Sequence, residues 1–330
     1  MAVFLLFIMG NDIENIFVGT LIISAFIIPI MLRYLNIRRF LINGHYSKEK
    51  LIEYLSFGWP FTLIMISSWM LNLFNRYIIK IYCGSKEVGI YSAIFNLSDQ
   101  SLSFIFMGLM LAVYPVLVKA WEIEGEEVTS RLITKFIRYY FILCLPVLIG
   151  LIILGDLVVN IFTTKDFEAG IKIIPYVAMS SFLIGLNQYF TKPLELKKRS
   201  KLLSLFMIVG AIINVSLAFI LIPQYGLKGA AISTLISYVV LTLINWYVGK
   251  RYIKYLIPKI SIIRVSIAVI FMGIIIEFLK NQLVENIFNL FFIIILSVFL
   301  YLLFLILIGE IKKSEITYLK GLIGLNNFSK

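Results

Sequence analysis

Apolar runs of about 20 residues recur along the chain and are separated by short polar segments. A run of that length crosses about 30 Å of hydrocarbon as an α-helix, and these runs lack the alternation that is typical of barrel strands. The pattern predicts an all-α, polytopic membrane protein with about nine full spans and an N-terminal partial span. The predicted full spans are approximately Phe17–Leu32, Leu55–Arg76, Val88–Tyr114, Phe136–Leu154, Ile171–Phe190, Leu202–Ile222, Leu227–Val248, Ile260–Phe278 and Ile287–Ile308.

The partial span is the apolar segment Met1–Met9. Its nine residues rise only about 13 Å in a helix, too little to cross the bilayer. It has no basic region and no small-residue cleavage site, so it is a poor signal peptide. We expect it to be the outer end of a helix whose beginning is missing.

Polar residues interrupt two consecutive spans at helical spacing. Leu55–Arg76 carries Ser68, Asn72, Asn75 and Arg76, and Val88–Tyr114 carries Ser92, Asn96, Asp99, Gln100 and Ser103. Each set is predicted to lie on one helix face. Such residues either form hydrogen bonds between neighbouring helices or line a polar passage. Two stripes on consecutive helices favour the passage, with Asn72, Asn75, Arg76, Asn96, Asp99 and Gln100 as candidate lining residues.

Arg76 and Asp99 are the charged residues of these two faces. With the intervening turn near Gly84–Lys86, both lie within the membrane and Arg76 is about one turn nearer the outside. One hypothesis is an Arg76–Asp99 ion pair that specifies packing. The alternative leaves the guanidinium to meet an anionic group of a ligand, since its fork of donors suits phosphate and carboxylate.

Other polar residues within the spans carry less weight. Asn187 and Gln188 close the span Ile171–Phe190 on one face with Ser180 and Ser181, and we count them as further lining candidates. Single amides elsewhere are predicted to form interhelical hydrogen bonds: Asn214, Asn245 and Asn289.

Composition and charge agree with a membrane protein. Hydrophobic residues make up 61% of the 330 residues and charged residues 15%, and the mean hydropathy is +0.97. Alternate loops hold most of the Lys and Arg, so the positive-inside rule predicts a cell-membrane protein with those loops and the C-terminus in the cytoplasm. The net charge of +12 then reflects orientation, and nothing indicates a nucleic-acid partner.

The sequence shows no arrangement typical of an enzyme or a cofactor site. The chain has two cysteines, Cys83 and Cys144, and one histidine, His45, which sits in a basic loop. These residues predict neither a disulfide framework nor a metal site, and no Gly-rich phosphate loop precedes a helix. We expect no catalytic residues, no metal and no cofactor.

Four stretches resemble a known superfamily. They are Gly58-Trp59-Pro60, Asn75-Arg76-Tyr77-Ile78, the segment Val88–Ala93, and the segment Ile222–Ser233. Together with their spacing they are similar to oligosaccharide flippases of the multidrug/oligosaccharidyl-lipid/polysaccharide exporter superfamily. Gly89, Pro223, Gly226 and Gly229 would form its tight turns, because glycine allows a short turn to close and helices to pack closely.

The resemblance implies a MATE-like architecture of two six-helix lobes around a cavity. Residues 1–50 would be the remnant of the first lobe with a linker, 51–254 the complete second lobe, and 255–330 an added helix pair with a cytoplasmic tail. It departs from the family in lacking about four helices of the first lobe. The family often has an acidic residue where Asn75 stands, so cation coupling through that position is in doubt.

The implied function is transport of a polyprenyl-diphosphate-linked oligosaccharide across the cytoplasmic membrane by alternating access, for synthesis of surface polysaccharide such as O-antigen. Its partners would be the lipid-linked oligosaccharide, membrane lipid, and a missing N-terminal lobe or other polysaccharide-assembly proteins. Two alternatives stay open: a multidrug/cation antiporter of the same superfamily, with Asp99 as its cation site, and a membrane polysaccharide polymerase or ligase.

Overall fold

The computed structural model describes residues 13–34, 47–283 and 286–311, and every regular element in them is helical. The predicted partial span Met1–Met9 and most of the tail after Gly309 lie outside the described residues. The elements are α2 (Ile13–Tyr34), α4 (Lys48–Tyr82), α5 (Ser85–Ile123), α6 (Glu126–Phe162), the 3-10 helix η1 (Lys165–Ile173), α7 (Ile174–Leu196), α8 (Ser200–Tyr225), α9 (Leu227–Tyr252), α10 (Lys259–Gln282) and α11 (Ile287–Leu307).

Seven helical segments of the described chain are long and apolar enough to cross a membrane. They match the seven predicted spans between Val88 and Ile308, with η1 and α7 forming one segment, so the all-α polytopic class is confirmed. The predicted span Phe17–Leu32 lies in α2, and Leu55–Arg76 lies in α4. With 35 residues α4 is long enough to cross, but the polar residues of its second half interrupt its apolar run.

The helices extend well past the apolar runs from which they were predicted. α5 has 39 residues and continues beyond Tyr114 to Ile123, and α6 has 37 and begins ten residues before Phe136. Hydrophobicity marks only the part of a helix that lies in hydrocarbon. The charged turns at either end are helix formers as well, and the sharp turn at Gly125, with φ of 84°, is what separates α5 from α6.

The chain divides into two compact units, Met1–Phe57 and Gly58–Lys330. The described part of the first comprises α2 and the beginning of α4, and α2 exposes apolar side chains along its length, including Leu21, Phe26 and Ile30. The second holds the rest of α4 and all the later helices. The domain boundaries predicted at 50/51 and 254/255 stay predictions.

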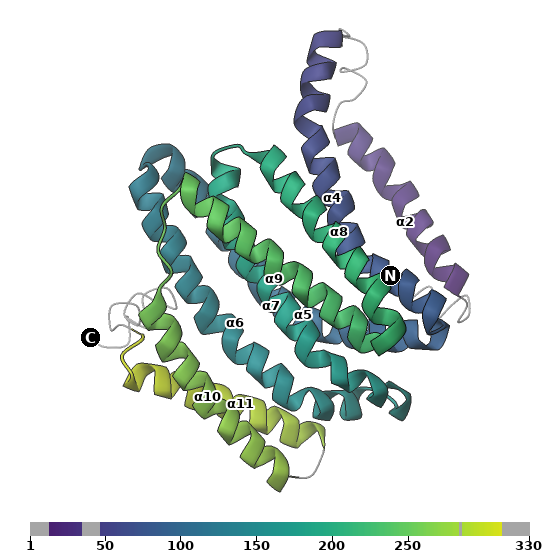
Figure 1. Cartoon of the computed structure of the whole chain (residues 1–330), viewed down its shortest axis with the longest axis vertical. Coiled ribbons are helices and arrows are strands. Elements are labelled where there is room, and N and C mark those ends of the chain that lie inside the picture. Colours follow the sequence, from purple (N-terminus) through teal and green to yellow (C-terminus); the bar gives the residue numbers. More distant parts are fainter. Residues whose placement is uncertain (1–12, 35–46, 284–285, 312–330) are drawn as a thin grey trace. The chain divides into compact units, whose positions relative to one another are not determined.

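The core of the second unit is built around α7, which packs against α5, α6 and α9 (Figure 1). Aromatic side chains fill the space between α6 and α7: the Tyr140 ring lies 5.1 Å from that of Phe182 and 5.4 Å from that of Tyr189. The helices approach closely at Gly185, where a Cβ would lie 2.5 Å from the Tyr140 hydroxyl. α8 packs on the other side of α9.

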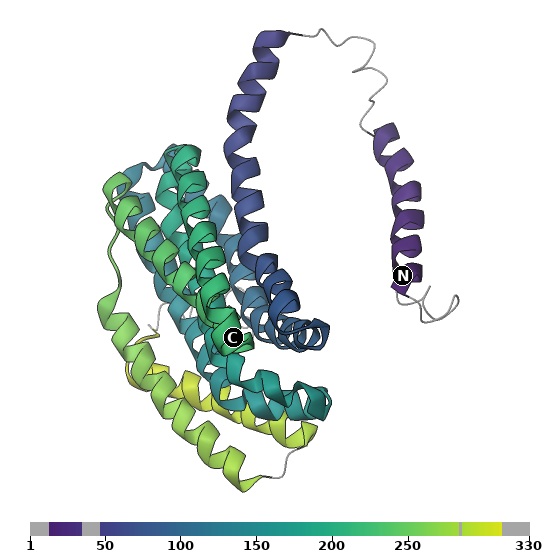
Figure 2. The same cartoon turned by 45° about the vertical axis from the view of Figure 1, so that its right-hand side comes forward.

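α10 and α11 form a separate layer against α6 (Figure 1, Figure 2). Their shared core contains Val265, Met272 and Ile293. Polar contacts hold the layer at both ends of α6. At one end the Arg138 side chain bonds the nearly fully buried Glu310, with Nε 2.6 Å from Oε1, and at the other Lys280 Nζ lies 2.6 Å from Asp156 Oδ2. The helices α10 and α11 therefore form part of the second unit.

Large apolar side chains cover much of the surface of these helices. Phe288, Leu111 and Phe104 each expose about four fifths of their area, at 82%, 79% and 80%. Such a surface is stable in lipid and would be an aggregation liability in water. The fold thus presents a membrane protein in which any exposed polar side chain at mid-helix stands out.

Candidate functional site

A short turn sets α4 and α5 side by side. α4 ends at Tyr82, Gly84 adopts a left-handed φ of 96°, and α5 begins at Ser85. The turn therefore falls where the sequence predicted it. Its consequence is a direct contact between the two polar faces, because an Arg76 Nη2 hydrogen donates to Asn96 Oδ1 over 3.2 Å.

Five of the predicted lining residues gather on one surface of these helices. Asn72, Asn96 and Gln100 are exposed, and Arg76 and Asp99 are half-buried. We call Asn72, Arg76, Asn96, Asp99 and Gln100 the α4–α5 polar strip. Exposed amides and charges within membrane-spanning segments face water or a bound polar group rather than lipid. The strip is the candidate functional surface.

Arg76 is the cation of the strip, and its guanidinium is only partly used. One N–H bonds Asn96, and Cζ lies 6.0 Å from the centre of the Phe95 ring. Among the described residues its Nε has no hydrogen-bond partner. A guanidinium has five N–H donors, so this one retains donors for an anion.

Asp99 is held by hydroxyl groups. Ser181 of α7 donates to its Oδ1 over 2.5 Å, and Ser103, one turn along α5, donates to its Oδ2 over 3.2 Å. Within the described chain it forms no ion pair with Arg76. The described contacts therefore do not include the Arg76–Asp99 ion pair of the first hypothesis.

Asn75 does not share the face of Arg76, contrary to the predicted stripe. It is 1% exposed, and its Nδ2 donates to the Ala230 carbonyl over 3.2 Å and to Thr234 Oγ1 over 2.8 Å. Asn214 Nδ2 lies 3.5 Å from the same hydroxyl. A step of one residue turns a helix by about 100°, and here it separates the interior of the unit from its surface. Asn75, Asn214 and Thr234 form what we call the buried amide cluster.

The buried amide cluster joins three helices, α4, α8 and α9, through neutral hydrogen bonds. An amide cannot carry the charge that a carboxylate brings to a cation site. No group of three or more His, Cys, Asp or Glu side chains that could hold a metal occurs in the described chain. The interhelical role predicted for Asn214 is confirmed, and Asn75 has the same role.

The two lining candidates on α7, Asn187 and Gln188, differ in burial. Asn187 is 9% exposed and its Oδ1 accepts from Asn245 Nδ2 of α9 over 3.0 Å, which confirms the interhelical bond predicted for Asn245. Gln188 is half-buried and lies two turns from Ser181 on the same face of α7. Gln188 therefore extends the surface next to Asp99, whereas Asn187 packs inward.

The predicted turn residues behave in two ways. Gly226, with φ of 57°, is the single residue between α8 and α9, Pro223 lies in the last turn of α8, and a Cβ on Gly229 would lie 2.3 Å from the Leu221 carbonyl oxygen. These observations confirm the tight turn. Gly89 lies inside α5, where a Cβ would meet no atom within 4 Å, so the glycine that makes the first turn is Gly84.

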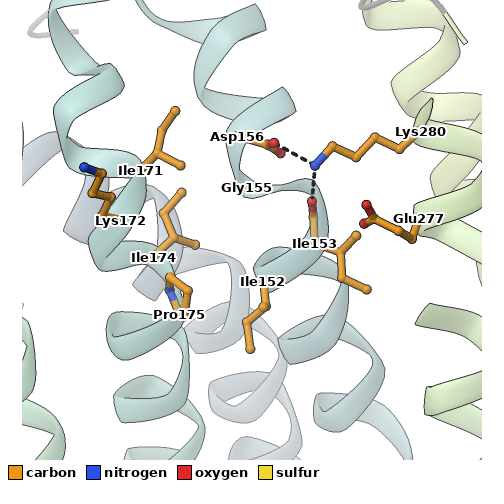
Figure 3. Close-up of a pocket in the computed structure, with 10 residues that line it drawn as sticks. All are labelled: Ile152, Ile153, Gly155, Asp156, Ile171, Lys172, Ile174, Pro175, Glu277 and Lys280. Atoms are coloured by element: carbon orange, nitrogen blue, oxygen red, sulfur yellow. Dashed lines mark hydrogen bonds and ion pairs between the residues drawn. The ribbon is translucent and has the colours of Figure 1, made fainter. Parts of the chain in front are cut away.

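Sequence reasoning missed a pocket of about 390 Å³ at the ends of α6 and α10, beside η1 and the start of α7. Figure 3 shows Lys280 reaching across it, with Nζ donating to Asp156 Oδ2 over 2.6 Å and to the Ile153 carbonyl over 2.9 Å. Glu277 points into the same space. These contacts use the donors of the Lys280 ammonium and hold α10 against α6. No periodicity within one helix would have revealed the pocket.

A second missed residue is Lys192 on α7. It is 5% exposed, and its Nζ lies 2.7 Å from Glu195 Oε2. It falls eleven residues after Ser181 and four after Gln188, which is one face of a helix. That spacing can be read in the sequence, but Lys192 lies just beyond the predicted span Ile171–Phe190.

The helices and their polar surface are those of a polytopic membrane protein. Residues 1–121 match the family described as "Polysaccharide biosynthesis protein". A "Putative O-antigen transporter" of Shigella dysenteriae is 29% identical over 201 residues, covering 59% of this chain and 48% of that protein. The "Probable low-salt glycan biosynthesis flippase Agl15" of Haloferax volcanii is 23% identical over 261 residues, covering 78% and 53%. The predicted resemblance to the flippase superfamily is confirmed.

Solved structures show the same fold. The structure "Lipid II flippase MurJ, inward closed conformation" superposes with a TM-score of 0.74 at 17% identity, over 94% of this chain and 64% of that one. A multidrug resistance MATE family transporter of the MOP superfamily in an outward-facing conformation gives 0.52 at 19%, over 67% and 52%. The chain thus has a MurJ/MATE-like fold, and it spans about half the length of the curated relatives that it matches.

Proposed function

We propose that this chain carries the second lobe of a flippase that moves a polyprenyl-diphosphate-linked oligosaccharide from the cytoplasmic to the outer leaflet by alternating access. The lobe comprises residues 51–254, which include the six helices α4 to α9. Residues 255–330 are the added helix pair with its tail, residues 1–50 belong to a first lobe, and the C-terminus is cytoplasmic. No catalytic residue, metal or cofactor takes part.

The observation that carries this proposal is the state of Arg76. Arg76, in the second half of α4, is half-buried, its buried Nε has no hydrogen-bond partner among the described residues, and exposed amides lie beside it. A diphosphate is the most strongly charged part of the proposed ligand, and guanidinium groups bind phosphate oxygens in pairs. The exposed amides of Asn72, Asn96 and Gln100 offer the donors and acceptors that sugar hydroxyls need. Relatives named as O-antigen transporter and glycan flippase support the same ligand class.

The strip also supports the proposal that a second lobe faces it. An ionisable side chain that points into lipid costs several kcal/mol of free energy. The strip therefore requires a polar or aqueous counterpart. We propose that this counterpart is the other lobe of the transporter, and that the cavity between them holds the oligosaccharide while the polyprenyl chain stays in the lipid.

The antiporter alternative has less support in these residues. It would require Asp99 to bind a cation, but both carboxylate oxygens already accept hydrogen bonds from serines. The buried amide cluster, where the resemblance would place another acid, is neutral. We therefore favour the flippase.

Glycan export by Arg76 variants tests the proposal in a flippase-deficient strain, using a coding sequence that carries these 330 residues and restores export. We expect Arg76→Glu to reduce export to the background of the strain, because it places a carboxylate where the diphosphate must bind. Arg76→Lys should retain part of the activity, since it keeps the charge but loses the paired donors. Membrane levels of each variant provide the control.

Two outcomes would contradict the proposal. Wild-type export by Arg76→Glu at equal membrane levels would exclude an anion contact at this position. Recovery of export on adding Asp99→Arg would instead show that the two residues act as an ion pair.

A further inference from the structure

The surface next to the α4–α5 polar strip continues along the contact between α5 and α7. Two contacts across these helices mark its course: Asp99 accepts from Ser181, and the Tyr114 ring receives the Lys192 ammonium at 4.7 Å from its centre. Residue numbers increase together in the two contacts, so α5 and α7 run in the same direction. The second contact lies eleven residues of α7 beyond the first, or roughly 16 Å.

Helical spacing keeps these residues on one side. Tyr114 follows Asn96 by eighteen residues, about five turns of α5, and Lys192 follows Ser181 by about three turns of α7. Tyr114 is 44% exposed, so the strip side of α5 is open at this level too. Lys192 therefore lies just beneath the same side of the helices as Arg76, with 5% of its area exposed, toward the end that the charge distribution predicts to be cytoplasmic.

Lys192 is held in a small charged cluster. Its Nζ lies 2.7 Å from Glu195 Oε2, and Thr191 Oγ1 donates to the other carboxylate oxygen over 2.8 Å. The carboxylate is thus fixed by two donors from its own helix. The ammonium has three donors, and among the described residues only Glu195 accepts a hydrogen bond from it.

A charged lysine this deeply buried costs free energy unless an anion compensates its charge. A carboxylate partner that a more strongly charged anion can replace allows such a site to bind that anion. We propose that Lys192 is a second phosphate contact of the transport surface, which receives the ligand's anionic group at the end predicted to be cytoplasmic, with Glu195 as the partner that the phosphate displaces. The inference rests on the proposed function and adds to it a binding site that the ligand reaches before Arg76.

Binding of a diphosphate probe by the purified chain in nanodiscs tests the site. The probe is farnesyl diphosphate, and farnesol, which lacks the charge, is the reference ligand. We expect Lys192→Gln to weaken diphosphate binding about tenfold, the effect of losing one charge-assisted contact, and to leave farnesol binding unchanged. Lys192→Arg should restore most of the affinity. Glu195→Gln should strengthen diphosphate binding severalfold, because it removes the competing anion.

The matched control is Lys201→Gln, which removes an exposed lysine from the start of α8 and should change neither affinity. Equal loss of diphosphate and farnesol binding in Lys192→Gln, or weaker diphosphate binding in Glu195→Gln, would overturn the proposal and leave Lys192 as a packing residue. If Arg76→Gln weakens diphosphate binding and Lys192→Gln does not, this inference fails and the proposed function stands. If the wild-type chain binds farnesol and the diphosphate equally, both fail.

Discussion

Arg76 and Asn75 are neighbours in α4, yet they belong to two regions of opposite character. The α4–α5 polar strip is exposed or half-buried, and the Arg76 Nε has no partner among the described residues, whereas the buried amide cluster is enclosed between α4, α8 and α9. Both consist of polar side chains inside apolar helices. The difference shows that polar side chains next to each other in one helix can lie in environments of opposite kind, and under the proposed function only Arg76 of these two contacts the ligand.

We expect the largest effect on stability at Gly229, where α9 lies closest to the backbone of α8. Gly229→Ala places a Cβ 2.3 Å from the Leu221 backbone carbonyl, which cannot move aside as a side chain could. We expect it to lower the free energy of unfolding by about 3 kcal/mol, measured by denaturant titration in mixed micelles. Gly89→Ala on the open side of α5 is the matched control, and it should raise stability by about 0.5–1 kcal/mol. Similar values for the two variants would contradict the close approach of α8 and α9.

A smaller change in the free energy of unfolding is expected for Asn75→Ala in the buried amide cluster than for Gly229→Ala. Asn75→Ala removes two interhelical hydrogen bonds, each worth about 0.6 kcal/mol in membrane proteins, and leaves a cavity, so we expect a loss of about 1–2 kcal/mol in the same titration. Asn72→Ala should stay within about 0.5 kcal/mol, because Asn72 is exposed and, within the described part of the chain, bonds only the Ser68 carbonyl of its own helix. A larger loss for Asn72→Ala than for Asn75→Ala would reverse the assignment of the two faces.

The sequence was sufficient to predict the seven spans between Val88 and Ile308 and the turns near Gly84 and Gly226, but not the full lengths of α5 and α6. Apolar runs and the glycines at 84 and 226 are local signals, and the physical preferences behind them act over a few residues. The relative placement of the polar faces of α4 and α5 followed from the shortness of their turn. The resemblance to the flippase superfamily rested on motifs at these same turns and in α4.

The rotation of α4 and the charged contacts between helices were not predictable in this way. Spacing puts Asn75 and Arg76 on neighbouring parts of one helix, but which part meets α9 depends on the packing of Ala230 and Thr234. Lys192 with Tyr114, and Lys280 with Asp156, pair residues that lie 78 and 124 positions apart. Such contacts arise only once the helices are assembled.

Thiol labelling tests the central claim, that the strip is open to water and the amide cluster is not. Cysteines are introduced singly at Asn96, Gln100, Ile94 and Asn214 in a background without Cys83 and Cys144, and membranes are treated with a charged methanethiosulfonate reagent. We predict rapid modification at 96 and 100 and none at 94 or 214, because Ile94 and Asn214 are fully buried. Equal rates at all four positions, or no modification at 96 and 100 in correctly folded protein, would contradict the account.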